Sequence, residues 1–532
     1  MAGVSPDVDS RPPTALAMFE AALAGGADRP LIKYFDGTLT MRDVDERANA
    51  LANLLMDNGF GFGDRLALFT QNNPAFVIGL VAAWKVGGVA VPINPMYTPR
   101  ELTYALIDTG ARALLSLDTL YEDVARDVVE SGESEVEVVV TTSVDDWRTG
   151  QNRLAGGRDD YRITELPAAP RVGTGRLTQN DSALLMYTSG TTGVPKATIN
   201  THANVTAGAE IYRRWMGLDA DDVVLGLTPV FHITGLIAHV AVALRLGAPL
   251  VLAHRFTANG ILDAIRAHRP TFVIGTISAL VSLVDASASA ADFSSIRRLG
   301  SGGAAISPTL AGKIEGAMGL PLTVVYGLTE TTSPALATPR DQPTPVDFES
   351  GALSVGIPLY DTVVRVVDDT GDEVAVGEVG ELAIAGPQVA AGYWGQQEAT
   401  DQFFPGGELR TGDIGFVDAD GWTFLIDRKK DMITSAGYKV WPREVEEVLY
   451  RHPDVAEAAV VGVPDEVRGE SVTAFVALER GRKADVDALM AYAREQLAAY
   501  KRPRRIVFTD ALPKTTSGKI LRRVLRDNGI SD

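Results

Sequence analysis

Short apolar runs rich in valine and isoleucine alternate with amphipathic stretches through most of the chain. A strand-like run at 65–69 precedes a helical pattern at 74–86, and a run at 113–117 precedes a helical pattern at 120–131. The same alternation continues from 250 to 284. Because parallel strands are joined through helical crossovers, this order predicts α/β layers with largely parallel sheets.

The pattern changes after about residue 350. Short strands are expected at 363–368, 380–385 and 422–427, and they are separated by turns such as Asp369-Thr370-Gly371-Asp372. Aspartate and glycine are typical of tight turns between neighbouring strands. This part of the chain therefore favours a small, mostly antiparallel β module.

A compact α+β tail follows the β module. Its apolar pattern predicts helices at 443–451 and 486–497, and strands at 455–462, 472–478 and 505–508. A chain of 532 residues exceeds the usual size of one core. We therefore expect an N-terminal domain over 1–427 and a small C-terminal domain over 428–532.

One segment, 233–252, is apolar for about the length of a membrane span. It contains His239, Arg245, Gly247 and Pro249, which favour a buried helix followed by a buried strand. No integral membrane segment is expected. The first thirteen residues lack the basic and apolar regions of a signal peptide, so a cytoplasmic soluble protein is expected.

Composition narrows the class of function. The formal net charge of −19 argues against a nucleic-acid-binding protein, which needs a basic surface. From Arg428 onward, lysine and arginine outnumber aspartate and glutamate by 20 to 16, whereas before it they are outnumbered by 29 to 52. A mildly basic tail on an acidic body suggests contact with an anionic small molecule. The absence of cysteine means that any thioester chemistry needs a thiol brought by a cofactor.

The strongest chemical signal follows the apolar run 184–187. It is a nine-residue loop of hydroxyls, glycines and one lysine, namely Thr188, Ser189, Gly190, Thr191, Thr192, Gly193, Val194, Pro195 and Lys196. Glycine lets backbone N–H groups approach oxyanions, hydroxyls add donors, and lysine adds a mobile charge, so the loop predicts a polyphosphate site. Proline at 195 and alanine at 197 depart from the P-loop pattern.

The string from Tyr187 to Lys196 resembles the signature of the adenylate-forming (ANL) superfamily, which includes acyl-CoA synthetases, luciferases and peptide-synthetase adenylation domains. Ala197 departs from the glycine usual at that position. Five further motifs follow in family order, so the resemblance spans essentially the whole chain. It implies a fold in which the small C-terminal domain is mobile about a hinge at Lys430.

Two motifs resemble the family's acid-binding side. Pro229-Val230-Phe231-His232 matches an aromatic and histidine gate beside the carboxylate, and Ser301-Gly302-Gly303-Ala304 matches a segment whose backbone lines the adenine and acyl pocket. The pocket implied is lined by Phe231, Ile233, Thr234, Ile277, Ser301, Gly302, Val325 and Leu328. No lining residue is cationic, which disfavours a dicarboxylic acid. Val325, at a position often glycine or alanine in relatives with deep pockets, hints at a short, medium or compact acid.

Three motifs resemble the nucleotide side. In Tyr326-Gly327-Leu328-Thr329-Glu330 the tyrosine is implied to pack on adenine, the threonine to contact phosphate and the glutamate to hold Mg²⁺. Asp413 matches the carboxylate that accepts the two ribose hydroxyls, and Arg428 a second ribose contact. Lys519, in the C-terminal motif, is implied to be catalytic, together with His232, Glu330 and Thr188.

The resemblance implies a two-step reaction that uses ATP, Mg²⁺ and coenzyme A. The acid displaces pyrophosphate to form acyl-AMP, and the thiol of coenzyme A then displaces AMP. The pantetheine arm is implied to pass Ser435, Ala436, Gly437 and Lys439. The basic residues Lys429, Lys439, Arg443, Lys501 and Arg502 are candidates for the CoA phosphates.

The expected function is an ATP-dependent acid–thiol ligase for an apolar monocarboxylic acid (medium-chain fatty, branched or aryl). The expected partner is a small-molecule carboxylic acid. Whether the chain forms a homodimer is left open by the sequence. One alternative is an acyl-AMP ligase that delivers to a carrier protein in trans, since no carrier domain follows Asp532. Another is an inactive nucleotide-binding regulator. A luciferase-like oxygenase shares the first step.

Overall fold

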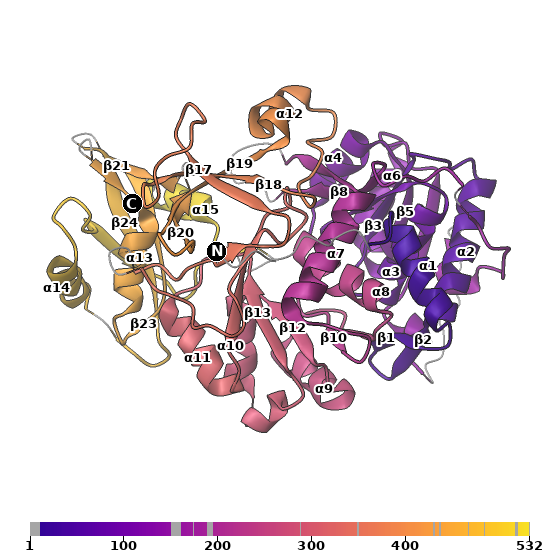
Figure 1. Ribbon diagram of the computed structural model, residues 1–532, viewed down its shortest axis with the longest axis horizontal. Helices are drawn as coiled ribbons and strands as arrows, with labels where there is room; N and C mark the ends of the chain where they lie inside the picture. The colour runs from indigo at the N-terminus through magenta and orange to yellow at the C-terminus, as the bar shows by residue number, and fades with distance from the viewer. Residues whose placement is uncertain are drawn as a thin grey trace.

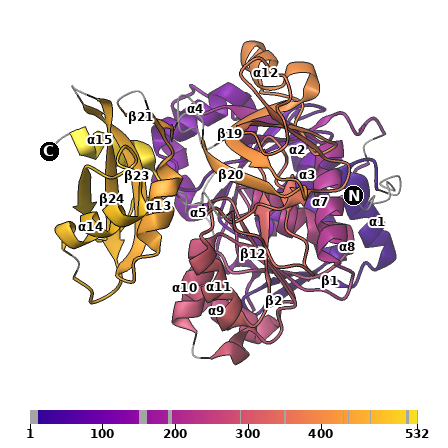
Figure 2. The ribbon, with the colours of Figure 1, turned by 60° about the vertical axis from the view of Figure 1, so that its left-hand side comes forward.

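The computed structural model describes residues 11–149, 161–173, 175–188, 195–287, 289–347, 351–428, 431–435, 438–465, 468–483, 485–515 and 520–530. Figure 1 shows two large sheet regions and a small antiparallel sheet, with the C-terminal unit at one end of the molecule. Figure 2 shows the same C-terminal unit beside the body from a second direction. The predicted α/β class with a smaller C-terminal domain is confirmed.

The seven-stranded sheet carries the predicted phosphate loop. Its order is β7-β6-β5-β3-β4-β8-β9, and only β8 and β9 pair antiparallel. The strands are β3 (Arg65–Phe69), β4 (Val89–Pro92), β5 (Ala111–Leu117), β6 (Val138–Thr142), β7 (Tyr161–Arg162), β8 (Ser182–Tyr187) and β9 (Ala197–Thr201). Along β3, Leu66 and Leu68 face one apolar core whereas Ala67 and Phe69 face another. This alternation is what a sheet buried on both faces requires.

The nine-stranded sheet carries the predicted acid pocket. Its order is β16-β15-β14-β13-β12-β10-β11-β1-β2, parallel from β14 to β1 and antiparallel at both ends. The strands are β1 (Pro30–Tyr34), β2 (Gly37–Thr40), β10 (Val224–Leu225), β11 (Leu250–Leu252), β12 (Phe272–Gly275), β13 (Arg298–Gly302), β14 (Leu322–Tyr326), β15 (Leu336–Ala337) and β16 (Ile357–Pro358).

The helices begin where the sequence supplies caps. Thr40, Thr98 and Thr201 each accept a backbone N–H and form capping boxes at three helix starts. The main helices of the body are α1 (Ala15–Gly25), α2 (Met41–Asp57), α3 (Pro74–Lys85), α4 (Pro99–Thr109), α6 (Arg126–Glu130), α7 (His202–Met216), α8 (Val242–Leu246), α9 (Ala258–His268), α10 (Ile277–Ala286), α11 (Pro308–Met318) and α12 (Gln397–Phe403).

The apolar segment 233–252 is buried inside the body. It forms a π-helical stretch (Gly235–Ala241), α8 and β11, as the prediction of a helix followed by a strand requires, although the π geometry was not expected. In the part of the chain that the structure describes, no helix is long and apolar enough to cross a membrane.

The predicted antiparallel module is a four-stranded sheet of β17 (Val363–Val367), β18 (Gly380–Ala385), β19 (Leu409–Val417) and β20 (Thr423–Arg428). The C-terminal unit contains β21 (Ile433–Ser435), β22 (Tyr438–Val440), α13 (Pro442–Tyr450), β23 (Val455–Asp465), β24 (Gly469–Leu478), α14 (Val486–Gln496), β25 (Arg505–Phe508) and α15 (Arg522–Ile530). Its apolar core is its own. This supports the proposed boundary after residue 427.

Buried carboxylates lie where the C-terminal unit meets β20. Asp427 accepts the backbone N–H of Arg443 at 2.9 Å, and the Arg443 guanidinium donates to the Leu425 carbonyl at 3.0 Å. Burial raises the pKa of Asp427 to about 6 and that of Glu447, on α13, to about 7, although Arg522 and Arg443 oppose these shifts. The ionised form of each carboxyl is thus less favourable in the folded chain than in the unfolded chain.

We expect Glu447→Gln to stabilise the C-terminal unit above pH 7 by about 2 kcal/mol. Each unit by which folding raises the pKa lowers the free energy of unfolding of the ionised form by about 1.4 kcal/mol. The folded pKa of Glu447 exceeds its unfolded value, so the penalty grows as the pH rises from about 4.5 to about 7. Thermal unfolding at pH 5 and pH 8 should show the gain at pH 8 only. The neighbouring Glu444→Gln, which loses an ion pair with Lys501, is the control. An equal gain at both pH values contradicts the prediction.

Candidate active site

The ends of the predicted phosphate loop are held together by the β8–β9 hairpin. Thr188 N–H donates to the Lys196 carbonyl at 2.9 Å, and the Tyr104 hydroxyl donates to the Pro195 carbonyl at 3.1 Å. On the preceding residue, the Tyr187 hydroxyl donates to Asp108 at 2.7 Å. The predicted loop residues Ser189, Gly190, Thr191, Thr192, Gly193 and Val194 lie outside the described residues. The frame of the loop is therefore built by backbone pairing and two tyrosines.

Lys196, at the end of the loop, extends over two aromatic rings. Its Nζ lies 5.6 Å from the ring centre of Tyr393 and 5.5 Å from that of Phe403. The Tyr393 hydroxyl donates to Oε1 of Glu330 at 2.9 Å. The structure thus brings the predicted phosphate lysine and the predicted metal carboxylate to one aromatic residue. Sequence reasoning missed Tyr393, whose only signal was an aromatic pair with Trp394 directly after Gly392.

The turn that carries Glu330 is tightly built. A Cβ on Gly327 would lie 1.4 Å from the Ser333 carbonyl oxygen, so only glycine fits there. The Asn200 side chain on β9 donates to the Thr329 carbonyl at 3.1 Å, and Ala390 N–H donates to the Glu330 carbonyl at 2.8 Å. Asn200, which the sequence analysis did not single out, therefore fixes the predicted nucleotide motif from the neighbouring sheet.

The predicted nucleoside residues Tyr326, Asp413 and Arg428 contact one another. The Tyr326 hydroxyl donates to Asp413 Oδ2 at 2.6 Å, and Arg428 Nε lies 2.9 Å from Asp413 Oδ1. Asp413 is 5% exposed, so its charge is balanced by these two donors. Burial and Asp413 raise the pKa of Tyr326, while Asp413 raises that of Arg428. The carboxylate is therefore held in a fixed orientation by two donors, in which it can accept further hydroxyl donors.

The predicted acid-binding residues divide among several cores. Phe231, Ile233 and Val325 belong to one buried cluster, whereas Ile277 packs in a second and Leu328 against a third. The Phe231 and His232 rings lie 4.7 Å apart. Thr234 is half-buried, whereas Gly303 and Ala304 are exposed beyond the end of β13. Phe231 of the aromatic gate and Val325 thus belong to the same buried apolar core.

Glycine and serine shape the adjoining strand end. A Cβ on Gly302 would lie 2.3 Å from the Val325 carbonyl oxygen on β14. Ser301 is fully buried, and its Oγ has no hydrogen-bond partner among the described residues. Gly235, after the aromatic gate, is equally constrained, because a Cβ there would lie 2.0 Å from the Pro229 carbonyl oxygen. Backbone therefore approaches backbone closely on both sides of the predicted acid pocket.

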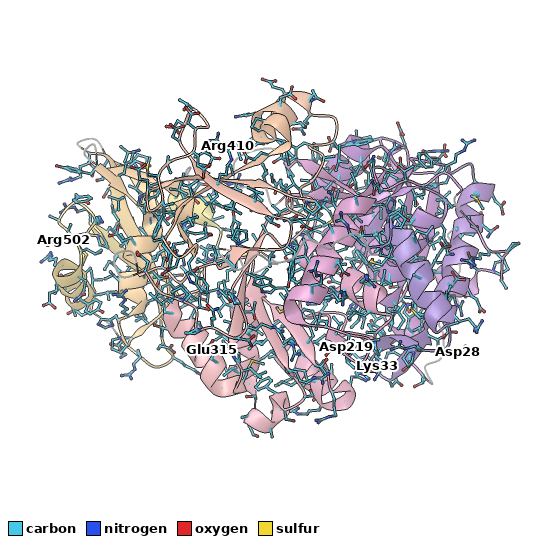
Figure 3. The ribbon with its side chains drawn as sticks, in the orientation of Figure 1. Asp28, Lys33, Asp219, Glu315, Arg410 and Arg502 are labelled. Atoms are coloured by element: carbon cyan, nitrogen blue, oxygen red, sulfur yellow. The ribbon has the colours of Figure 1, made fainter. Side chains whose placement is uncertain are left out.

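The predicted CoA segment is partly described. Ser435 and Lys439 lie on the paired strands β21 and β22, Ser435 buried and Lys439 exposed. Arg443 is 7% exposed and its guanidinium donates to the Leu425 carbonyl in this arrangement, so its suggested contact with a CoA phosphate stays a prediction for the rotated state. Arg502 lies on the outer side of the C-terminal unit (Figure 3). Four further predicted residues, Lys429, Lys430, Ala436 and Gly437, and the predicted catalytic Lys519 lie outside the described residues.

The residues present fit a weakly held Mg²⁺ that needs phosphate oxygens. Within the described ranges, no three histidine, aspartate or glutamate side chains converge as a metal cage. Glu330 offers a hard oxygen ligand, and Tyr393 occupies only its Oε1. A single carboxylate suits Mg²⁺, which keeps several waters and shares the oxygens of a bound polyphosphate.

Comparison with known proteins identifies the family to which the chain belongs. Residues 19–394 match the model of the AMP-binding enzymes, and residues 444–519 match that of the AMP-binding enzyme C-terminal domain. A long-chain-fatty-acid–CoA ligase of Bacillus subtilis is 35% identical over 94% of this chain and 91% of its own length. A feruloyl-CoA synthase of Amycolatopsis is also 35% identical, over 93% and 95%.

A solved structure of ATP-bound MatB from Rhodopseudomonas palustris has a TM-score of 0.86 at 27% identity, covering 97% of this chain and 99% of that one. The apo structure of the same protein, at equal identity and coverage, has a TM-score of 0.75. The arrangement of this chain is thus more similar to the ATP-bound structure.

We expect Gly302→Ala to cost about 3 kcal/mol of unfolding free energy, because its Cβ would force β13 and β14 apart. Gly303→Ala is the matched control. Gly303 has φ 79°, and no neighbouring atom lies within 4 Å of the place that an alanine Cβ would take, so alanine there costs about 1 kcal/mol of backbone strain. Denaturant unfolding of both variants measures the difference. Equal losses would contradict the close approach of β14.

Proposed function

The chain belongs to the AMP-binding enzymes as an AMP-forming acyl-CoA synthetase, and we propose that its substrate is an apolar monocarboxylic acid, of the medium-chain fatty, branched or aryl kind. The observation that carries the substrate class is that Phe231, Ile233 and Val325, three residues of the predicted pocket, are all buried in one large apolar core of the body. None of these side chains offers a cation to a second carboxylate. The relatives reported above are a long-chain-fatty-acid–CoA ligase and a feruloyl-CoA synthase, whose names include one fatty and one aryl acyl group.

Val325 supports a compact acid over a long unbranched chain. Val325 is 6% exposed, and its partner on the neighbouring strand, Gly302, has no side chain that could pack against it. An isopropyl group at this place occupies volume that a smaller residue would leave to the substrate. The preference for a compact acid rests on Val325, and it would distinguish this chain from the long-chain-fatty-acid–CoA ligase that is 35% identical to it.

In this proposal the described residues divide the work of the first step. Asp413 and Arg428 orient the ribose, and Tyr326 packs on adenine while it buttresses Asp413. Lys196 and the 188–196 loop hold the charge of the leaving pyrophosphate. Bound Mg²⁺ at Glu330 would neutralise phosphate charge. Lys519 brings a further cation to the α-phosphate as the acid oxygen attacks and the bond to pyrophosphate breaks.

In the second step the C-terminal unit rotates about Lys430. The rotation withdraws Lys519 and brings the 435–437 segment to the bound acyl-AMP. The thiol sulfur of CoA attacks the acyl carbon, AMP leaves with the bonding electron pair, and the thiol proton is released. His232 and Phe231 lie beside the acyl group as the gate for this exchange.

The test of the substrate class is pyrophosphate release with a panel of acids, scored with and without CoA. We expect release with medium-chain, branched and aryl monocarboxylates, acyl-CoA only when CoA is present, and at least tenfold lower kcat/KM for matched dicarboxylates, in keeping with the cost of an unpaired buried charge. A dicarboxylate used as efficiently as its monocarboxylate contradicts the proposal. Product formation with a carrier phosphopantetheine but not free CoA would assign the acceptor differently.

We expect Lys519→Ala to lower pyrophosphate release at least a hundredfold while sparing thioester formation from supplied acyl-AMP, because the lysine stabilises charge in the first step only. The two half-reactions are assayed separately on the same preparation. Equal loss of both half-reactions would contradict a role confined to adenylation.

We expect Lys430→Pro to show the opposite pattern, since proline fixes the φ angle of the residue about which the C-terminal unit is proposed to turn. Pyrophosphate release should persist, whereas acyl-CoA formation from supplied acyl-AMP should fall at least tenfold. Unchanged thioester formation would place the hinge elsewhere.

A further inference from the structure

Tyr393, which lies beside Lys196, is held in place by burial, ring packing and backbone hydrogen bonds. It is 7% exposed, and its ring packs edge-on against Phe403 and Phe404, with centroid distances of 6.0 and 5.4 Å. Its backbone N–H donates to the Thr400 hydroxyl at 2.9 Å. The residue also bridges to Thr198 on β9, so both the main chain and the ring are fixed before any ligand binds.

This one side chain contacts two opposite charges by different means. Its hydroxyl donates to Glu330 Oε1 at 2.9 Å, and its ring face lies below Lys196 Nζ at 5.6 Å. A hydrogen bond to a carboxylate and a cation over an aromatic face are both favourable interactions. Among the described residues, Lys196 and Glu330 form no ion pair with each other or with another side chain.

The separation of these charges has a chemical consequence. A direct Lys196–Glu330 ion pair would occupy the ammonium needed by a phosphate and the oxygen needed by a cation. The ring contacts the ammonium without an ion pair and leaves it open to an anion, and the hydroxyl occupies one carboxylate oxygen only. The Tyr393 hydroxyl is the donor in this contact, at 2.9 Å from Glu330 Oε1.

We propose that Tyr393 is a positioning residue of the adenylation step, which aims Glu330 at the metal and Lys196 at the leaving pyrophosphate while it keeps the two charges from pairing. The inference rests on the proposed roles of Glu330 and Lys196. The alternative is a purely structural role, in which Tyr393 only packs the loop between β18 and α12. The two readings differ in what removal of a single oxygen atom should change.

Tyr393→Phe keeps the ring beneath Lys196 and removes the donor to Glu330. We expect the free Mg²⁺ concentration needed for half-maximal pyrophosphate release to rise about tenfold, which is the effect of one charge-assisted hydrogen bond. Thioester formation from supplied acyl-AMP needs neither the metal carboxylate nor a leaving pyrophosphate, so it should change less than twofold. Pyrophosphate release and thioester formation are measured across a Mg²⁺ titration at saturating ATP.

Tyr393→Leu removes the ring as well as the hydroxyl. We expect it to add to the Mg²⁺ effect a rise in the KM for ATP, since Lys196 then loses one aromatic face and can turn toward Glu330. A KM for ATP equal to that of Tyr393→Phe would overturn the ring's part in placing Lys196.

Tyr212→Phe is the matched control. Tyr212 is buried on α7, and its hydroxyl contacts Ser333 Oγ at 2.9 Å, so the same atom is removed without a carboxylate partner. Its Mg²⁺ requirement should match that of the wild type, whatever its loss in Tm. If Tyr393→Phe instead lowers both half-reactions equally, or leaves the Mg²⁺ requirement unchanged, Tyr393 only packs the loop and the inference is overturned. A wild type that releases no pyrophosphate with any acid would contradict the proposed function instead.

Discussion

The backbone pairing of β9 is the interaction on which the candidate site depends. One side of the strand pairs with β8 and closes the phosphate loop between Thr188 and Lys196. Its other side pairs with the segment 391–394, through Ile199 to Gly392 and Ala197 to Trp394. Because buried main-chain groups must be hydrogen-bonded, this double pairing fixes the phosphate loop and the Tyr393 segment to each other.

Side chains of β9 also hold the predicted nucleotide motif in place through hydrogen bonds. Asn200 leaves β9 to hold the Thr329 carbonyl, and Thr198 buries its hydroxyl against the Met186 carbonyl. The turn that presents Glu330 is therefore fastened from the seven-stranded sheet, although its own strand belongs to the nine-stranded sheet. A site at the junction of two sheets can hold opposite charges apart because each charge is anchored in a different layer.

Local patterns predicted the elements better than the contacts between them. The strands β3, β18 and β25 begin and end where the apolar runs predicted, because period-two burial is a local property. The glycine-rich and tyrosine motifs likewise indicated the fold family from short strings. The partnership of Tyr393 with Glu330 and Lys196 joins residues far apart in the chain, and no local pattern encodes which aromatic ring will lie beneath a given lysine.

Burial produced the other differences from expectation. Arg443 looked like one of several exposed basic residues in the tail, yet Asp427 and the Leu425 carbonyl hold it inside the joint with β20. Helix α15 was not predicted either. Its first residue, Arg522, forms ion pairs with Glu446 and Asp427. A basic residue that looks solvated in the sequence is therefore paired within the C-terminal unit and at its contact with β20.

These charged contacts bear on how the C-terminal unit can move. Its apolar core, around Ile433, Val460 and Ala474, contains no residue of the body, and the joint at β20 is made by Asp427, Arg443 and Arg522. Separating an apolar interface exposes area that water disfavours, whereas charged groups released from a joint regain hydration. A polar joint next to the proposed hinge therefore suits the proposed rotation, in which the unit docks for adenylation and leaves before the thiol arrives.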